Sequence, residues 1–158
     1  MTTTYDPNLD FAVAPSLHPR QPAHDLTLVA LHTAIRFSGL FARFTAQRWC
    51  LRPLGDVAER VAAELIARAV ETTGNPDPCP RYSELGELRI IGIRVSATDS
   101  GLLIEVWDSD PTPPHESYLD DHLSAVEEIS QQWSCYPINS GKVIWAELAS
   151  HASPTCSG

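Results

Sequence analysis

Residues 87–108 read Glu87-Leu-Arg-Ile-Ile-Gly-Ile-Arg-Val-Ser-Ala97-Thr-Asp-Ser-Gly101-Leu-Leu-Ile-Glu-Val-Trp-Asp108, and this stretch decides the fold. Apolar residues occupy alternate positions on both sides of Thr98-Asp-Ser-Gly101, which has the composition of a turn. A period of two places successive side chains on opposite faces of a strand. Two such runs joined by a short turn predict an antiparallel β-hairpin.

A strand and a helix are predicted before this hairpin. Residues 25–31 have the composition of a strand. Phe37, Leu40, Phe41 and Phe44 then follow at i, i+3, i+4 and i+7, which is the spacing of one helix face. We expect the three phenylalanines to lie in the core rather than against a cofactor.

A second helix is predicted to begin at Asp56-Val-Ala-Glu59, which has the form of a capping box. In that motif an N-cap side chain and a Glu three residues later satisfy free backbone N–H groups. The apolar positions that follow share one side of the helix, which should face the core: Val57, Val61, Leu65, Ile66, Ala69 and Val70. The helix is expected to end at Thr72-Thr-Gly74.

Another helix is predicted at residues 118–132, followed by a hairpin that pairs 134–138 with 142–149. The full order is strand, helix, helix, hairpin, helix, hairpin. That order lets helices cover one face of a mostly antiparallel sheet and bury its apolar side. The predicted fold class is therefore an α/β two-layer sandwich.

One domain is expected, because 158 residues with 43% hydrophobic content suit a single core. We place it at residues 24–149. Four prolines and few phased apolar positions indicate a flexible N-terminal arm at residues 1–23. Residues 150–158 are expected to be a C-terminal tail.

Charge and hydropathy exclude some kinds of binding partner. The 20 acidic and 11 basic residues give a net charge of -9, which repels a phosphate backbone and argues against nucleic acid. A protein surface that is basic or neutral suits the chain better. No apolar run reaches membrane-spanning length and the first ten residues are polar, so we expect a cytoplasmic chain with no membrane partner.

Metal and disulfide signals are missing from the sequence. The four cysteines (Cys50, Cys79, Cys135 and Cys156) form no C-x-x-C pair and are expected to be free, mostly structural thiols. The six histidines share no metal-ligand spacing and are expected to be surface residues. No metal site is predicted.

Three motifs, in order and spacing, resemble those of a known family: Ala63-Glu64-Leu65, residues 101–114 and residues 132–148. The family is the anti-sigma-factor serine/threonine kinase branch of the GHKL (histidine-kinase-like ATPase) superfamily. The resemblance implies the Bergerat fold, which agrees with the two-layer sandwich predicted from the pattern. It also implies Mg-ATP as the cofactor of an active member and a sigma factor or an anti-sigma antagonist as partner.

The second helix departs from the family pattern. Family members read Glu-Leu-x-x-Asn-Ala-x-x-His, with the Glu as catalytic base and the Asn as magnesium ligand, whereas this chain reads Glu64-Leu-Ile-Ala-Arg68-Ala-Val-Glu-Thr72. The resemblance implies that Glu64 is catalytic if the chain is active, and that Arg68 and Thr72 occupy nucleotide-binding positions. A guanidinium group only donates hydrogen bonds, so Arg68 cannot ligate a cation.

Two interpretations of Arg68 stay open. Glu64 lies four residues before it, so the two can form an exposed helical ion pair worth about 0.3 to 0.5 kcal/mol and without function. Alternatively, the arginine meets a phosphate directly.

Asp108 is the best candidate for a ligand contact. It ends a strand in phase with Leu102, Ile104 and Val106, so its carboxylate should point to the helix-covered side of the sheet. The resemblance implies that it accepts a hydrogen bond from the adenine amino group. The alternative is that it caps its own turn, a common use of Asp.

The phosphate-binding segment departs most. Family members carry a glycine-rich stretch whose N–H groups approach the phosphates, but this chain has no glycine between Ser109 and Ser140. Asp120 and Asp121 add negative charge there. In the last hairpin, Val143 replaces the hydroxyl residue of the family's Gly-Lys-Thr-Val-Trp and is assigned to the nucleotide-binding positions.

Trp107 and Trp145 lie on the opposite strand parity from the core residues. If they are neighbours on the open sheet face, they form an aromatic patch suited to association.

Three functions remain after these observations. The first is a regulatory protein that has lost Mg-ATP binding and acts through a protein partner or as a homodimer. The second is an active ATP-dependent serine/threonine kinase of the same family. The third is a binder of a nucleoside-like small molecule.

Overall fold

The computed structural model describes residues 22–115 and 119–150. Its elements run in the order β1 (Ala23–Val29), α2 (His32–Arg48), the 3₁₀ turn η1 (Arg52–Leu54), α3 (Gly55–Thr73), the 3₁₀ turn η2 (Tyr82–Glu84), β2 (Ile90–Ala97), β3 (Gly101–Asp108), α4 (Asp121–Ile129), β4 (Gln132–Ile138) and β5 (Gly141–Ala149). The arm predicted at residues 1–23 and the tail at 150–158 fall outside the described residues, except for their inner ends. Ala23 belongs to β1 rather than to the arm.

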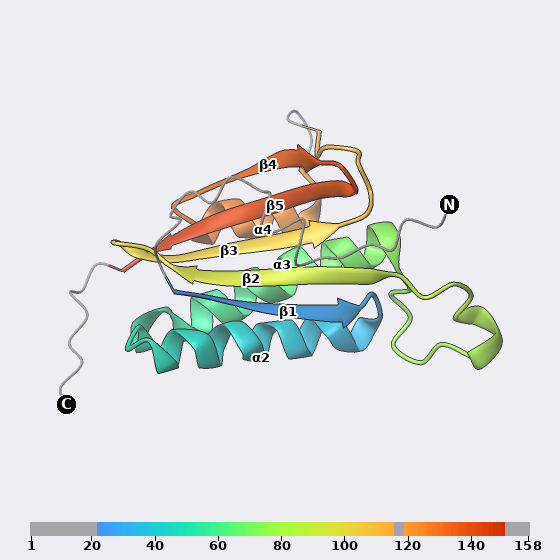
Figure 1. Cartoon of the computed structure of the whole chain (residues 1–158), viewed down its shortest axis with the longest axis horizontal. Coiled ribbons are helices and arrows are strands. Elements are labelled where there is room, and N and C mark those ends of the chain that lie inside the picture. The colour runs from blue at the N-terminus through green and yellow to red at the C-terminus, as the bar shows by residue number, and fades with distance from the viewer. Residues whose placement is uncertain (1–21, 116–118, 151–158) are drawn as a thin grey trace.

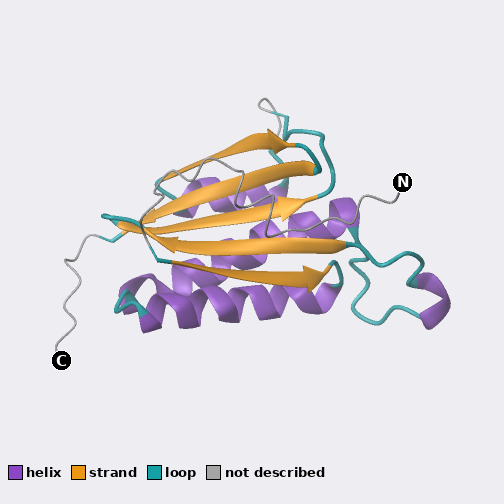
Figure 2. Cartoon of the chain, viewed as in Figure 1, coloured by secondary structure: helices purple, strands orange, loops and turns teal. Residues whose placement is uncertain are grey.

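The strands form one five-stranded sheet in the order β1-β2-β3-β5-β4, and every neighbouring pair is antiparallel. Figures 1 and 2 show α2, α3 and α4 together on one side of this sheet. The chain is therefore α+β, with an antiparallel sheet in one layer and helices in the other. The two-layer arrangement predicted from the sequence is confirmed at the level of fold class.

The central hairpin of β2 and β3 forms as the alternation predicts. Its apolar residues lie in the core under the helices: Ile91, Ile93, Val95, Leu102, Ile104 and Val106. Thr98 closes the turn, because its N–H donates to the Gly101 carbonyl at 2.9 Å and its hydroxyl accepts from the Gly101 N–H at 2.9 Å. A side chain at Gly101 would place its Cβ 1.9 Å from the Leu148 carbonyl oxygen, so only glycine fits.

The core prediction for α3 is confirmed. This helix packs across the middle of the sheet and also contacts both neighbouring helices. Val57 is only partly buried against the core, and the other expected residues are buried: Val61, Leu65, Ile66, Ala69 and Val70.

The predicted core face of α2 is wrong. Phe37 and Phe44 are each 62% exposed, and Phe41 is only partly buried. The buried side of α2 instead carries small residues: Ala34, Ser38, Gly39, Ala42, Thr45 and Ala46. The reason is close helix packing, since a Cβ at Gly39 would already lie 3.2 Å from the Glu59 backbone on α3.

The predicted N-cap of α3 is also wrong. The helix begins at Gly55 after η1, and its N-cap, Leu54, is in a helical conformation with no side-chain cap. Asp56 therefore lies inside the first turn. Arg43 of α2 takes both carboxylates of the expected capping box, at 3.0 Å from Asp56 and 2.7 Å from Glu59.

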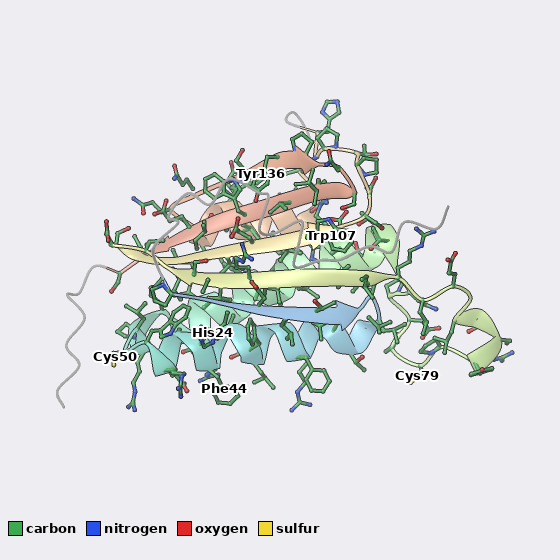
Figure 3. The ribbon with its side chains drawn as sticks, viewed as in Figure 1. His24, Phe44, Cys50, Cys79, Trp107 and Tyr136 are labelled. Carbon is green, nitrogen blue, oxygen red and sulfur yellow. The ribbon has the colours of Figure 1, made fainter. Side chains whose placement is uncertain are left out.

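The expected aromatic patch does not form. Trp107 is 2% exposed and packs with Val143. Figure 3 shows Trp107 on β3, the central strand, and Tyr136 on β4, the edge strand opposite to β1. Trp145 lies opposite Glu105, two pairs further along the β3–β5 ladder from Trp107, and is only partly exposed. The sequence parity was sufficient to place both tryptophans away from the core helices but not to predict their exposure.

Two further expectations concern the cysteines and the membrane. Cys79 and Cys135 are free, whereas Cys50 is disulfide-bonded, so the expectation of a free thiol is wrong for Cys50.

None of the helices among the described residues combines the length and the apolar character needed to cross a bilayer.

Candidate functional site

Three charged residues of α3 meet the start of α4. Glu64, Arg68 and Glu71 are spaced at i, i+4 and i+7, so they project from one side of the helix. The residues that contact them are Asp120, the N-cap of α4, and His122 in its first turn. The start of α4 therefore lies directly against the polar side of α3.

Arg68 pairs with Asp120 and not with Glu64. Its Nε donates to Asp120 Oδ2 at 2.7 Å, and its side chain is only 10% exposed. The predicted exposed pair with Glu64 is therefore wrong, because α4 supplies a carboxylate that covers the arginine. Arg68 NH1 is buried and has no hydrogen-bond partner among the described residues.

Asp120 uses both of its carboxylate oxygens. Oδ2 accepts from Arg68, while Oδ1 accepts from the Leu123 N–H at 2.9 Å and so caps α4. Burial alone would raise the pKa of Asp120, but the hydrogen bonds from Leu123 and Arg68 hold that pKa below its ordinary value. Asp120 therefore stays ionised and joins the two helices.

His122 lies between two glutamates of α3. Its Nδ1 is 2.7 Å from Glu64 Oε2, and its Nε2 is 3.1 Å from Glu71 Oε1. Both ring nitrogens can donate only in the protonated imidazolium. Partial burial lowers the pKa of His122, but the two carboxylates outweigh it and raise that pKa above its ordinary value of 6.5.

The contact of His122 with Glu64 changes the chemistry available to Glu64. Its Oε2 lies 2.7 Å from Nδ1 of His122, so this oxygen is already engaged within the chain. Glu64 is thus placed as one end of an ionic bridge between α3 and α4. His122 was expected to be a surface residue, and no spacing rule links it to Glu64 and Glu71, which lie 58 and 51 positions earlier in the chain.

This bridge makes the stability of the fold depend on pH. Because the folded-state pKa of His122 is raised, its contribution is fully present below about pH 6.5 and is lost as the pH rises through the raised pKa. We expect the advantage of the wild type over His122→Gln in urea unfolding to shrink by up to about 1 kcal/mol over that range, since the pair is partly exposed. An advantage that stays constant with pH would contradict the bridge.

Asp108 is buried together with Lys142, and each is about 1% exposed. The Lys142 ammonium donates to Asp108 Oδ1 at 2.8 Å, to the Asp110 carbonyl at 2.7 Å and to Asp110 Oδ2 at 3.3 Å. Burial raises the pKa of Asp108, and Lys142 opposes that shift. All three N–H donors of Lys142 are therefore used within the protein.

The two interpretations of Asp108 can now be compared with its contacts. The Asp110 N–H donates to Asp108 Oδ1 at 2.9 Å, which is the turn-capping arrangement. The side chain is in phase with core residues such as Val106, so it lies on the helix-covered side of the sheet as expected. In the carboxylate that the resemblance assigned to adenine, Oδ1 accepts both of these hydrogen bonds from the chain itself.

Thr72 and Val143 lie apart from this cluster. The Thr72 hydroxyl donates to the Arg68 carbonyl of its own helix at 3.0 Å. Val143 packs against Trp107 on the sheet face opposite to Lys142, because neighbouring strand residues alternate in direction. The structure therefore brings together Glu64, Arg68 and α4, and separately Asp108 and Lys142.

The arrangement offers little for catalysis or metal binding. Every carboxylate of the cluster named above is paired with a cationic side chain. Burial raises the pKa of the Cys135 thiol, which makes it a poor nucleophile. Among residues 22–115 and 119–150, no group of three or more His, Cys, Asp or Glu side chains is placed to hold a metal ion.

Comparisons with known proteins assign the chain to no family. No protein-family model matches the chain, and no curated protein matches it significantly.

Proposed function

We propose that the chain is a regulatory protein with a GHKL-like fold of the anti-sigma-factor kinase type, that it does not use Mg-ATP, and that it acts by binding another protein. The partner is a sigma factor, an anti-sigma antagonist or a similar protein of transcriptional or signalling control. The observation that carries the proposal is that the polar groups at the family's ligand positions are engaged within the chain. Glu64 contacts His122, Arg68 contacts Asp120, and Asp108 contacts Lys142.

The order of elements supports the fold part of the proposal. The resemblance implies a Bergerat domain, whose elements follow the order strand, two helices, hairpin, helix and hairpin. The observed order from β1 to β5 is compatible with it. The segment where members hold the phosphates is here the helix α4, whose N-cap is a carboxylate. An ionised carboxylate at that helix start disfavours a triphosphate, because like charges repel.

The active-kinase alternative has less support. It needs Glu64 as a free base, yet this carboxylate pairs with His122. It also needs a magnesium ligand at position 68, where a buried arginine lies. The nucleoside-binding alternative needs the Asp108 carboxylate, which accepts from Lys142 and from a backbone N–H.

Ligand-linked stability tests the proposal. A ligand that binds only the folded state adds about 2.7 kcal/mol at one hundred times its dissociation constant. We expect millimolar ATP with Mg²⁺ to leave the urea midpoint unchanged, and no phosphate transfer to a serine-bearing protein. Transfer from radiolabelled ATP would establish the kinase alternative.

A further inference from the structure

A groove lies between α2 and α3 on the surface of the helical layer. Its volume is about 530 Å³, and Ile35, Phe37, Leu40 and Ala63 form its apolar lining. Phe44 extends the same side of α2, because Phe37, Leu40 and Phe44 are spaced at i, i+3 and i+7. Figure 3 shows Phe44 on α2 pointing away from the sheet.

Two phenylalanines this exposed are unusual on one helix of a folded domain. Exposed apolar residues that gather beside a recess mark interaction sites, whereas single ones need no explanation. Phe37 and Phe44 are separated by two helical turns, about 10 Å. That spacing suits the anchors of a partner helix that lies along the groove.

The α2 wall of this groove is basic although the whole chain is acidic, and Glu59 on the α3 wall is paired with Arg43. α2 contains three arginines and no Asp or Glu, in a chain of net charge -9. Arg43 is neutralised by Asp56 and Glu59 of α3. Arg36 and Arg48 are exposed and form no ion pair with any residue of the described ranges.

We propose that this groove, with Phe37, Leu40 and Phe44 as its apolar floor and rim, docks an amphipathic acidic helix of a partner protein. The apolar side chains of that helix fill the recess, and its carboxylates pair with Arg36 and Arg48. This inference rests on the proposed function as a protein-binding module and names the surface and the chemistry of the partner.

Charge favours an acidic helix in the groove over two other occupants, a second copy of the chain and an anionic membrane. A second copy of the chain would bring the same arginines face to face, which like-charge repulsion disfavours. An anionic membrane would attract α2 but repel the rest of a chain that carries -9. A recess between two helices also suits side chains of a helix better than a flat lipid surface.

The test uses a fluorescein-labelled peptide about 18 residues long, a length that can form a helix on its own. It carries Leu at i, i+3, i+4 and i+7, Glu at the positions that flank this apolar face and Ala elsewhere, since like charges at every other position would repel and unfold the helix. A second peptide has Lys in place of Glu. We expect fluorescence anisotropy to show saturable binding of the acidic peptide only. The Phe37→Ala/Phe44→Ala protein should bind it at least about tenfold more weakly.

Two further variants define the result. Arg36→Glu/Arg48→Glu should lose the acidic peptide and gain the lysine peptide. Tyr82→Ala is the matched control, since Tyr82 is 93% exposed on η2 and should leave binding unchanged. All changed side chains are exposed, so the unfolding midpoints should match the wild type and confirm that each variant folds.

Several outcomes would overturn the inference. These are no binding of the acidic peptide, equal binding of both peptides, unchanged binding by the phenylalanine variant, or binding to phosphatidylserine vesicles in place of the peptide. Self-association of the wild type that the phenylalanine variant abolishes would assign the groove to a second copy. Titration of the same samples with Mg-ATP tests the proposed function separately, because ATP binding would refute that proposal whatever the peptide does.

Discussion

Lys142→Met is expected to destabilise the fold by about 3–5 kcal/mol. Methionine keeps most of the volume of lysine but removes the ammonium that meets Asp108 and Asp110. Asp108 is then left buried without its counter-charge, and desolvation of an unpaired carboxylate is the main cost. Urea unfolding at neutral pH measures the change.

The double variant Lys142→Met/Asp108→Leu provides the decisive comparison. Replacing both members of a buried pair by apolar groups removes the unpaired charge, so the double variant should be more stable than Lys142→Met alone. Asp25→Asn breaks a more exposed pair with Arg94 and should change stability by less than about 1 kcal/mol. A loss for Lys142→Met as small as that of Asp25→Asn would show that the buried pair does not hold this end of the sheet.

Arg68→Asn is expected to destabilise the fold by about 1–3 kcal/mol and not to create ATP binding. Asparagine is the family's magnesium ligand at this position, but it is too short to reach Asp120 as the arginine does at 2.7 Å. The joint between α3 and α4 would be weakened. Glu64 would still pair with His122, and Asp108 with Lys142, so these two positions, which only the family resemblance assigns to a nucleotide site, would remain engaged.

Arg60→Asn is the matched control for this change. Arg60 is exposed on the same helix and forms no ion pair among residues 22–115 and 119–150, so its loss should change stability by less than about 0.5 kcal/mol. Unfolding and ATP titration of both variants separate the two parts of the prediction. Binding of Mg-ATP by Arg68→Asn would contradict this expectation and show that the residue at position 68 alone prevents it.

The sequence was a reliable guide wherever one local pattern determined the outcome. Alternation in residues 91–106 and the turn at Thr98 predicted the central hairpin, and the apolar period after Val57 predicted the core side of α3. The pattern failed on α2, where two apolar faces compete. The face with small residues around Gly39 is the buried one, because it allows α3 to approach closely. Phe37 and Phe44 are therefore exposed to solvent.

The candidate site was only partly accessible from the sequence. Position 68 and Asp108 were found because they fall in local motifs, but their partners lie far along the chain. Asp120 is 52 residues from Arg68, and Lys142 is 34 residues from Asp108. Ion pairs over such separations depend on how α4 packs on α3 and on the β3–β5 register, which no local pattern specifies.

The most direct test of the central claim is isothermal titration calorimetry of the wild-type protein with ATP, with and without Mg²⁺, and with adenosine alongside. We expect no binding heat in any of the three titrations, because Glu64, Arg68 and Asp108 are already engaged by His122, Asp120 and Lys142. Micromolar, magnesium-dependent binding of ATP would contradict it and show that these internal pairs open to admit the nucleotide.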